Sequence, residues 1–265
     1  MIRAIRSEFL KFFSTRLWWG MAIGIATAGA GFAALMAWVL TRPTDPAGGP
    51  NQAPVGDASQ IAISVYTGGL AVGYVLLLTI GVMHIGAEYR HKTISATFLA
   101  TPRRVRALVA KAVSLVGVGI VYGLISFAAA VLVGAIWLQR TGHDAFPSSS
   151  VLRSLALSLV VLGLWALIGL GLGILIPNQV TALLLGVGFA FVIEPIISLA
   201  LTFWSWGKDH ILPYLPSAAT TAALDGVRRP DTVQLEWWAA LLVLAAYAAV
   251  LAGFGIWRAA RQDVS

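Results

Sequence analysis

Long apolar runs, separated by short clusters of charged residues, constrain this chain more than any other feature. The run from Leu155 to Ile176 is apolar on every side of a helix. Such runs reach the roughly 20 residues that a helix needs to cross about 30 Å of hydrocarbon. A transmembrane β-barrel would instead alternate apolar and polar residues with period two. The pattern therefore predicts an all-α integral membrane protein.

The composition supports the same prediction and excludes several classes of protein. Hydrophobic residues make up 58% of the 265 positions and charged residues 11%, and the mean hydropathy is +0.84. A water-soluble domain of this length could not bury that much apolar surface. The chain has no cysteine, and its four histidines are well separated, so no metal site is expected. The net charge of +7 lies beside apolar runs, which favours anionic lipid over nucleic acid as its partner.

Six membrane spans are expected in one transmembrane domain, residues 1–265. In the fourth span, Gly169, Gly171 and Gly173 have the spacing that is typical of close helix packing. A loop at 88–111 follows the second span, and a longer outer loop is expected at 204–236. The spans are predicted at about 17–40, 61–87, 112–138, 151–176, 180–203 and 237–257.

Residues 1–16 are predicted to form an amphipathic helix in the membrane interface. Ile5, Phe9 and Phe12 recur at spacings of three and four and so share one helix face, whereas Arg3 and Arg6 lie on the other. A helix of this type lies flat in the interface, so we expect its aromatic stripe to contact lipid.

The distribution of basic residues predicts the orientation. Twelve of the eighteen Lys and Arg residues fall in 1–16, 88–111 and 258–265, which all lie on one side of a six-span protein. Because basic residues accumulate on the cytoplasmic side, both termini are expected in the cytoplasm.

The basic loop after the second span carries the most local information. Thr101 is a good N-cap and Pro102 a good first helical residue, so a helix is expected to start there. Before it, Thr93 can cap a short helix that bears Ile94 and Phe98 on one face. An apolar face of this kind suits either a groove in a partner protein or a surface of anionic lipid, and charge alone does not decide between them.

A family resemblance favours the protein partner. The loop resembles the cytoplasmic loop of ABC exporter permeases of the type 2 family, and Leu212 to Ser217 resembles a segment common before the last span of that family. The residues of the loop that carry the resemblance are Glu88, Arg90, Thr93, Leu99, Pro102, Arg103, Arg104 and Lys111.

The resemblance implies a coupling helix at 93–100 that docks on a separate ATP-binding subunit. Glu88 and Arg90 would pair with one another or with neighbouring helices. The candidate coupling residues are Glu88, Arg90, Lys92, Thr93, Ile94, Phe98, Leu99, Pro102, Arg103 and Arg104.

The chain has no phosphate-binding loop, so no cofactor is expected in it, and the resemblance places ATP and Mg²⁺ in the partner. It also implies an assembly of two ATPase subunits with two permease subunits in a bacterial cytoplasmic membrane. The permease pair is expected as a homodimer or as a pair with a related permease. The permease would export a drug, lipid, peptide or natural product.

Glu194, next to Pro195, is the acidic residue that falls well inside a predicted span. An ionisable group there is costly unless it is paired or hydrated, so it indicates a substrate path or a proton site. It would be structural if it lay near the outer interface, where Pro195 ends or kinks the helix.

Enzyme functions are not expected. The motifs of intramembrane proteolysis and of lipid head-group transfer are incomplete, since the downstream aspartates of the latter motif do not follow Asp225-Gly226. The alternatives to an ATP-driven permease are a membrane anchor or sensor and a secondary transporter.

Overall fold

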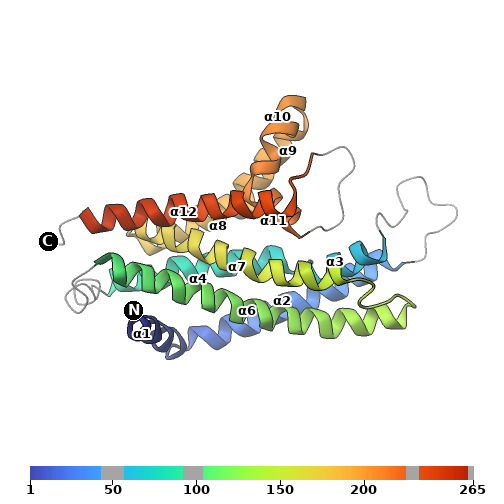
Figure 1. The fold of residues 1–265 in the computed structure, drawn as a ribbon, viewed down its shortest axis with the longest axis horizontal. Coiled ribbons are helices and arrows are strands. Elements are labelled where there is room, and N and C mark those ends of the chain that lie inside the picture. The colour runs from blue at the N-terminus through green and yellow to red at the C-terminus, as the bar shows by residue number, and fades with distance from the viewer. Residues whose placement is uncertain (43–56, 92–103, 225–232, 262–265) are drawn as a thin grey trace.

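The computed structural model describes residues 1–42, 57–91, 104–224 and 233–261. All regular elements in these ranges are helices (Figure 1). Six of the helical segments are long and apolar enough to cross a membrane, at Trp18–Leu40, Ala58–Arg90, Val105–Arg140, Ser149–Leu175, Gln179–Thr202 and Trp237–Arg258. The predicted coupling helix at 93–100 lies outside the described residues.

The bundle is built around the fourth span, α7 (Ser149–Leu175), which contacts α4 (Leu70–Arg90), α6 (Arg104–Arg140) and α12 (Trp237–Arg261). The first span, α2 (Leu17–Leu40), packs mainly on α6. The second span begins as α3 (Ala58–Thr67) and continues as α4. The start of α1 and the end of α12 lie at one end of the bundle, together with the end of α4 and the start of α6 (Figure 1).

The N-terminal helix, α1 (Ile2–Phe13), is amphipathic, as its sequence predicts, but its aromatic stripe faces protein. Phe12 is buried and its ring meets Tyr122 of α6 edge-on, with 6.0 Å between centroids. Phe9 lies against Gly117 of α6, where a β-carbon would come within 2.5 Å of the ring. The expectation that the stripe contacts lipid was therefore wrong. The same face also carries Glu8, whose side chain contacts His84 and Lys111 inside the bundle.

The fifth span is interrupted. It starts as α8 (Gln179–Gly188), passes through a π-helical turn at Phe189–Ile193, and continues as α9 (Glu194–Thr202). Pro195 explains the interruption, because it donates no hydrogen bond and its ring clashes with the carbonyl four residues earlier. After this turn, α9 and the short α10 (Ser205–His210) leave the side of the bundle (Figure 1).

The expected outer loop at 204–236 contains more helix than its sequence indicated. After α10, the chain returns through a 3₁₀ turn at Leu212–Tyr214 and forms α11 (Pro216–Ala223). This helix is mostly buried and contacts α12 and α7. It is therefore part of the bundle.

The closest contact between spans is that of α4 with α7, and it requires glycine on both helices. A β-carbon at Gly169 would overlap the carbonyl oxygen of Leu78, and one at Gly81 would overlap that of Ala166. The absence of side chains at these two positions lets the backbones approach, as is common in membrane helices.

We predict that Gly169→Ala destabilises the protein by about 1–3 kcal/mol, because the helices must separate. Gly31→Ala in α2 is the matched control, since nothing lies within 4 Å of a β-carbon built there. Thermal unfolding of the full chain in nanodiscs measures both. Equal melting temperatures for the two variants would contradict the packing described.

Candidate functional site: a buried charge cluster and an anchored outer helix

Five ionisable side chains meet where α1, α4 and α6 come together. We call this group the charge cluster; its members are Glu8, Lys11, His84, Glu88 and Lys111. Glu8, Glu88 and Lys111 are buried, and the His84 side chain is 7% exposed. The two carboxylates and two ammonium groups balance in charge, as buried ions must.

Glu8 is the centre of the charge cluster because it accepts from three donors. Lys111 Nζ donates to its Oε2, Lys11 Nζ lies 2.8 Å from its Oε1, and His84 Nε2 lies 3.1 Å from its Oε2. A carboxylate only accepts hydrogen bonds, so His84 Nε2 carries the proton in this contact. One side chain of α1 is thus bonded to both α4 and α6.

Glu88 completes the charge cluster from the end of α4. Its Oε1 lies 3.1 Å from Lys111 Nζ and 3.2 Å from Lys11 Nζ. Of the two pairings expected for Glu88, the structure therefore contains the one with neighbouring helices. Arg90 is exposed, and its guanidinium lies 3.4 Å from His91.

Glu88, the first residue of the loop motif, thus forms an ion pair with Lys111, its last residue. The loop between α4 and α6 joins two helices whose ends are held together. Arg104 is the first residue of α6. Seven of the ten predicted coupling residues lie outside the described residues: Lys92, Thr93, Ile94, Phe98, Leu99, Pro102 and Arg103.

Electrostatics favours the ionised form of Glu8. Burial alone would raise the pKa of its carboxyl, but the hydrogen bond from His84 and the charges of Lys111 and Lys11 outweigh burial and hold the pKa well below its ordinary value of 4.5. Burial likewise opposes the charge of Lys11, but Glu8 and Glu88 raise its pKa above the ordinary 10.5.

The two pKa shifts, of Glu8 and Lys11, widen the range of pH in which these side chains stabilise the folded protein. The contribution of Glu8 is present above pH 4.5 and is lost as pH falls through its lowered pKa. The contribution of Lys11 is present below pH 10.5 and is lost as pH rises through its raised pKa. Glu8 and Lys11 therefore both remain ionised at neutral pH.

Three members of the charge cluster, Glu8, Lys11 and His84, were not identified from the sequence as site residues. Glu8 interrupts the apolar stripe of α1 between Ile5 and Phe12, and a carboxylate at that position requires a buried partner. His84 precedes Glu88 by one helical turn and so lies on the same face of α4. Both signals are present in the sequence, but only the fold shows that the two faces meet.

The second group lies around Glu194, the first residue of α9. Its side chain is fully buried, and Oε1 accepts a hydrogen bond of 2.6 Å from the backbone N–H of Ser217. Ser217 is in the first turn of α11, where the positive end of the helix dipole favours a carboxylate. The other oxygen, Oε2, is buried and has no hydrogen-bond partner among the described residues.

Helix α7 holds the rest of α11. Trp165 Nε1 donates to Thr220 Oγ1 at 2.9 Å, and Ser154 Oγ donates to the carbonyl oxygen of Leu224 at 2.7 Å. Trp165 also stacks on Tyr74 of α4, with 4.3 Å between centroids. Side chains from two spans therefore fix the beginning, middle and end of α11.

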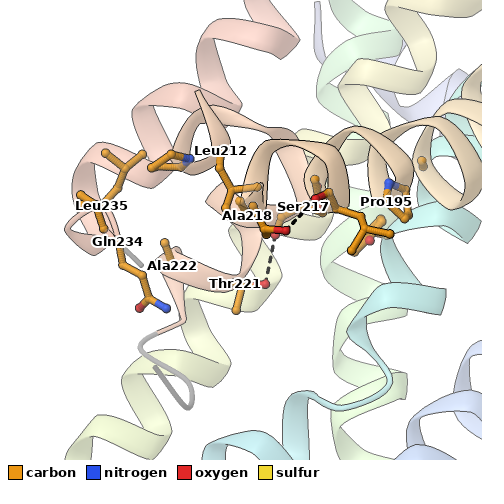
Figure 2. A pocket seen from close by; sticks show the side chains of 15 residues that line it. Pro195, Leu212, Ser217, Ala218, Thr221, Ala222, Gln234 and Leu235 are labelled. Atoms are coloured by element: carbon orange, nitrogen blue, oxygen red, sulfur yellow. Dashed lines mark hydrogen bonds between the residues drawn. The ribbon is translucent and has the colours of Figure 1, made fainter. Parts of the chain in front are cut away.

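A cavity of about 460 Å³ lies beside this helix (Figure 2). Pro195, Ser217, Thr221 and Gln234 surround it, from α9, α11 and the chain before α12 (Figure 2). Much of the remaining lining is apolar and includes Leu199, Leu212, Pro213, Val233 and Leu235.

The fold and comparison with known proteins now define the class of protein. Six apolar helices make it a multi-pass membrane protein. Residues 4–196 match the family model described as ABC-2 family transporter protein, which covers most of the chain, so the chain belongs to this family. It is the membrane permease component of an ABC-2 type transporter, a family that associates with a separate ABC ATPase. No similar protein was found among curated proteins.

The charge cluster generates a test by double-mutant cycle. Glu8→Gln removes the closest carboxylate partner of Lys111. Lys111→Met removes an ammonium partner from the two buried carboxylates, Glu8 and Glu88. Each variant is therefore expected to lose about 3–5 kcal/mol of stability. The double variant removes one charge of each sign and should be more stable than the sum of the two losses predicts, by about 1–3 kcal/mol.

Unfolding of the full chain in nanodiscs measures all four corners of the cycle. Lys208→Met, in α10, is the control for the loss of a lysine elsewhere. Strict additivity of the two substitutions would show that Glu8 and Lys111 do not interact.

Proposed function

We propose that this chain is the permease subunit of an ATP-driven exporter that works by alternating access. Two copies would pair with two ATPase subunits, which bind ATP and Mg²⁺. Closure of the ATPases on ATP would push on residues 93–100 and switch the permease between inward-open and outward-open states. Both termini would lie in the cytoplasm of a bacterium.

The bond between Glu88 and Lys111 is the observation that carries this proposal. It joins the last turn of α4 to the first part of α6, on either side of the proposed coupling helix. A force on the loop would therefore act on both helices together. Through Glu8, it would also act on α1.

Packing gives that force a route into the bundle. Helix α4 contacts α7 along its length, with Gly81 and Gly169 at their closest approach. Helix α7 in turn holds α11 through Trp165 and Ser154. Interlocked helices of this kind move as units, because close-packed interiors do not deform continuously. A displacement at the coupling loop would thus reach the outer part of the protein.

The position of the charge cluster also argues against a simple membrane anchor. An anchor requires only apolar helices, whereas several buried charges have a large desolvation cost. This desolvation cost is offset by a functional need where helices must keep fixed positions relative to one another while they move. The proposed exporter has this requirement at its cytoplasmic end.

The proposal predicts that the full chain co-purifies with an ABC ATPase and that deletion of residues 93–100 abolishes the association. Phe98→Glu should weaken it at least tenfold, because a charge replaces the apolar contact that the groove would bury. Phe146→Glu is the matched control, since Phe146 is exposed in the loop between α6 and α7. Association that persists after the deletion would contradict the coupling assignment.

A further inference from the structure

A further site is suggested by Glu194, because its carboxylate has no counter-ion among the residues that the structure describes. The side chain is fully buried, and Oε2 has no hydrogen-bond partner among the described residues. Leaving a buried oxygen unpaired costs about 1–3 kcal/mol, and more when it is charged. The charge cluster at the other end of α4 shows how the chain satisfies buried carboxylates elsewhere, with two lysines and a histidine.

The short bond to Ser217 does not complete the site. It satisfies Oε1 and favours the ionised form, since the donor lies at the N-terminus of α11. Burial of the side chain favours the neutral form. A positive group beside Oε2 would shift this balance towards the anion and would remove the unpaired acceptor. The missing partner is therefore a cation with an N–H donor.

The cavity beside α11 can admit such a partner. Ser198 lines it and lies one helical turn after Glu194 on the same face of α9. Pro195 and Ser217, which flank the carboxylate in sequence and by hydrogen bond, also line it (Figure 2). Glu194 itself does not line the cavity, because its carboxylate lies behind Pro195 and Ser217 and is fully buried. A ligand in the cavity would reach Oε2 through a shift of the first turn of α11.

The side chains that line the cavity indicate what the remainder of the ligand, apart from its cationic group, is like. Leucine, proline and valine side chains supply most of the apolar surface. Five hydroxyl-bearing residues line the cavity and supply hydrogen-bonding positions: Tyr74, Ser198, Thr202, Ser217 and Thr221. A volume of about 460 Å³ lies within the range of small-molecule sites. An apolar body with one protonated amine matches these properties.

We propose that the cavity between α9 and α11 binds amphiphilic organic amines, with Glu194 as the counter-ion of the ammonium group. That these amines are also the transported molecules rests on the permease function proposed above. Binding itself does not, because the site is built from residues of this chain alone.

Fluorescence titration of the full chain in nanodiscs tests the site directly. Dansylcadaverine carries a primary amine, and its uncharged analogue, N-pentyl dansylamide, has the same apolar body without it. We expect saturable binding of the amine, with the uncharged analogue at least tenfold weaker, because a hydrogen bond to a charged group contributes about 1.5–3 kcal/mol. Empty nanodiscs measure partition of both probes into lipid.

Two substitutions and a control assign the binding to the cavity. Glu194→Gln should weaken dansylcadaverine at least tenfold and leave the uncharged analogue unchanged. Ala218→Leu retains the carboxylate but fills the cavity, so it should weaken both probes even if Glu194→Gln fails to fold. Glu236→Gln removes an exposed carboxylate near the same end of α12 and should change neither.

Three results would overturn the site: equal affinity for the two probes, unchanged binding in Glu194→Gln or in Ala218→Leu, or binding no greater than that of empty nanodiscs. None of these results bears on ATPase association, which tests the permease function separately. Conversely, amine binding without ATPase association would leave the site standing and refute the transport role.

Discussion

The bonding of Glu8 determines how the end of the bundle that contains α1 is assembled. A carboxylate on the apolar face of an amphipathic helix cannot stay in lipid, so α1 must turn that face towards donors. Lys111 of α6 and His84 of α4 supply them, and Lys11 adds a third from α1 itself. Once these contacts form, the aromatic residues of the same face pack on the spans, and α1 becomes part of the bundle.

The two ends of the protein satisfy buried carboxylates in different ways. Where α1, α4 and α6 meet, Glu8 and Glu88 each have an ammonium partner, so that these contacts are strong. At the other end of α4, Glu194 accepts from one backbone N–H, and its second oxygen has no hydrogen-bond partner among the described residues. The first arrangement suits a fixed joint, whereas the second suits a group that changes partner. This contrast fits a permease in which force is transmitted through the rigid charge cluster and a ligand binds near Glu194, whose partners can change.

Much of the fold follows from the sequence, because membrane spans are local features. Hydrophobic runs of about 20 residues identified six spans, and the structure has candidate spans in the same six regions. The amphipathic period of residues 1–16 predicted α1, and the glycines of the fourth span lie where α7 packs closely. Pro195 is a local sequence signal for the π-helical turn before Glu194. No local signal in the sequence predicts the path that α9 takes after this turn.

The site was less predictable, because it depends on contacts between distant segments. Glu8 and Lys111 are 103 residues apart, and Glu194 meets Ser217 only because α11 folds back into the bundle. The segment 204–236 is rich in polar and turn-forming residues, so it was expected to be a loop. Within this segment, the burial of α11 depends on Trp165, Ser154 and Glu194, which hydrogen-bond to it from other helices. A charged residue in an apolar stripe shows that a partner exists but does not identify it.

The central claim is that Glu8 fastens α1 to the ends of α4 and α6. A distance measurement by pulsed electron resonance tests it most directly, because the chain has no cysteine and accepts spin labels at chosen sites. Leu10→Cys in α1 and Val105→Cys in α6 are both exposed positions. The account predicts a single narrow distance distribution in nanodiscs that becomes broad when Glu8→Gln is added. An equally narrow distribution in both chains would show that α1 is held by its apolar face alone and would contradict the claim.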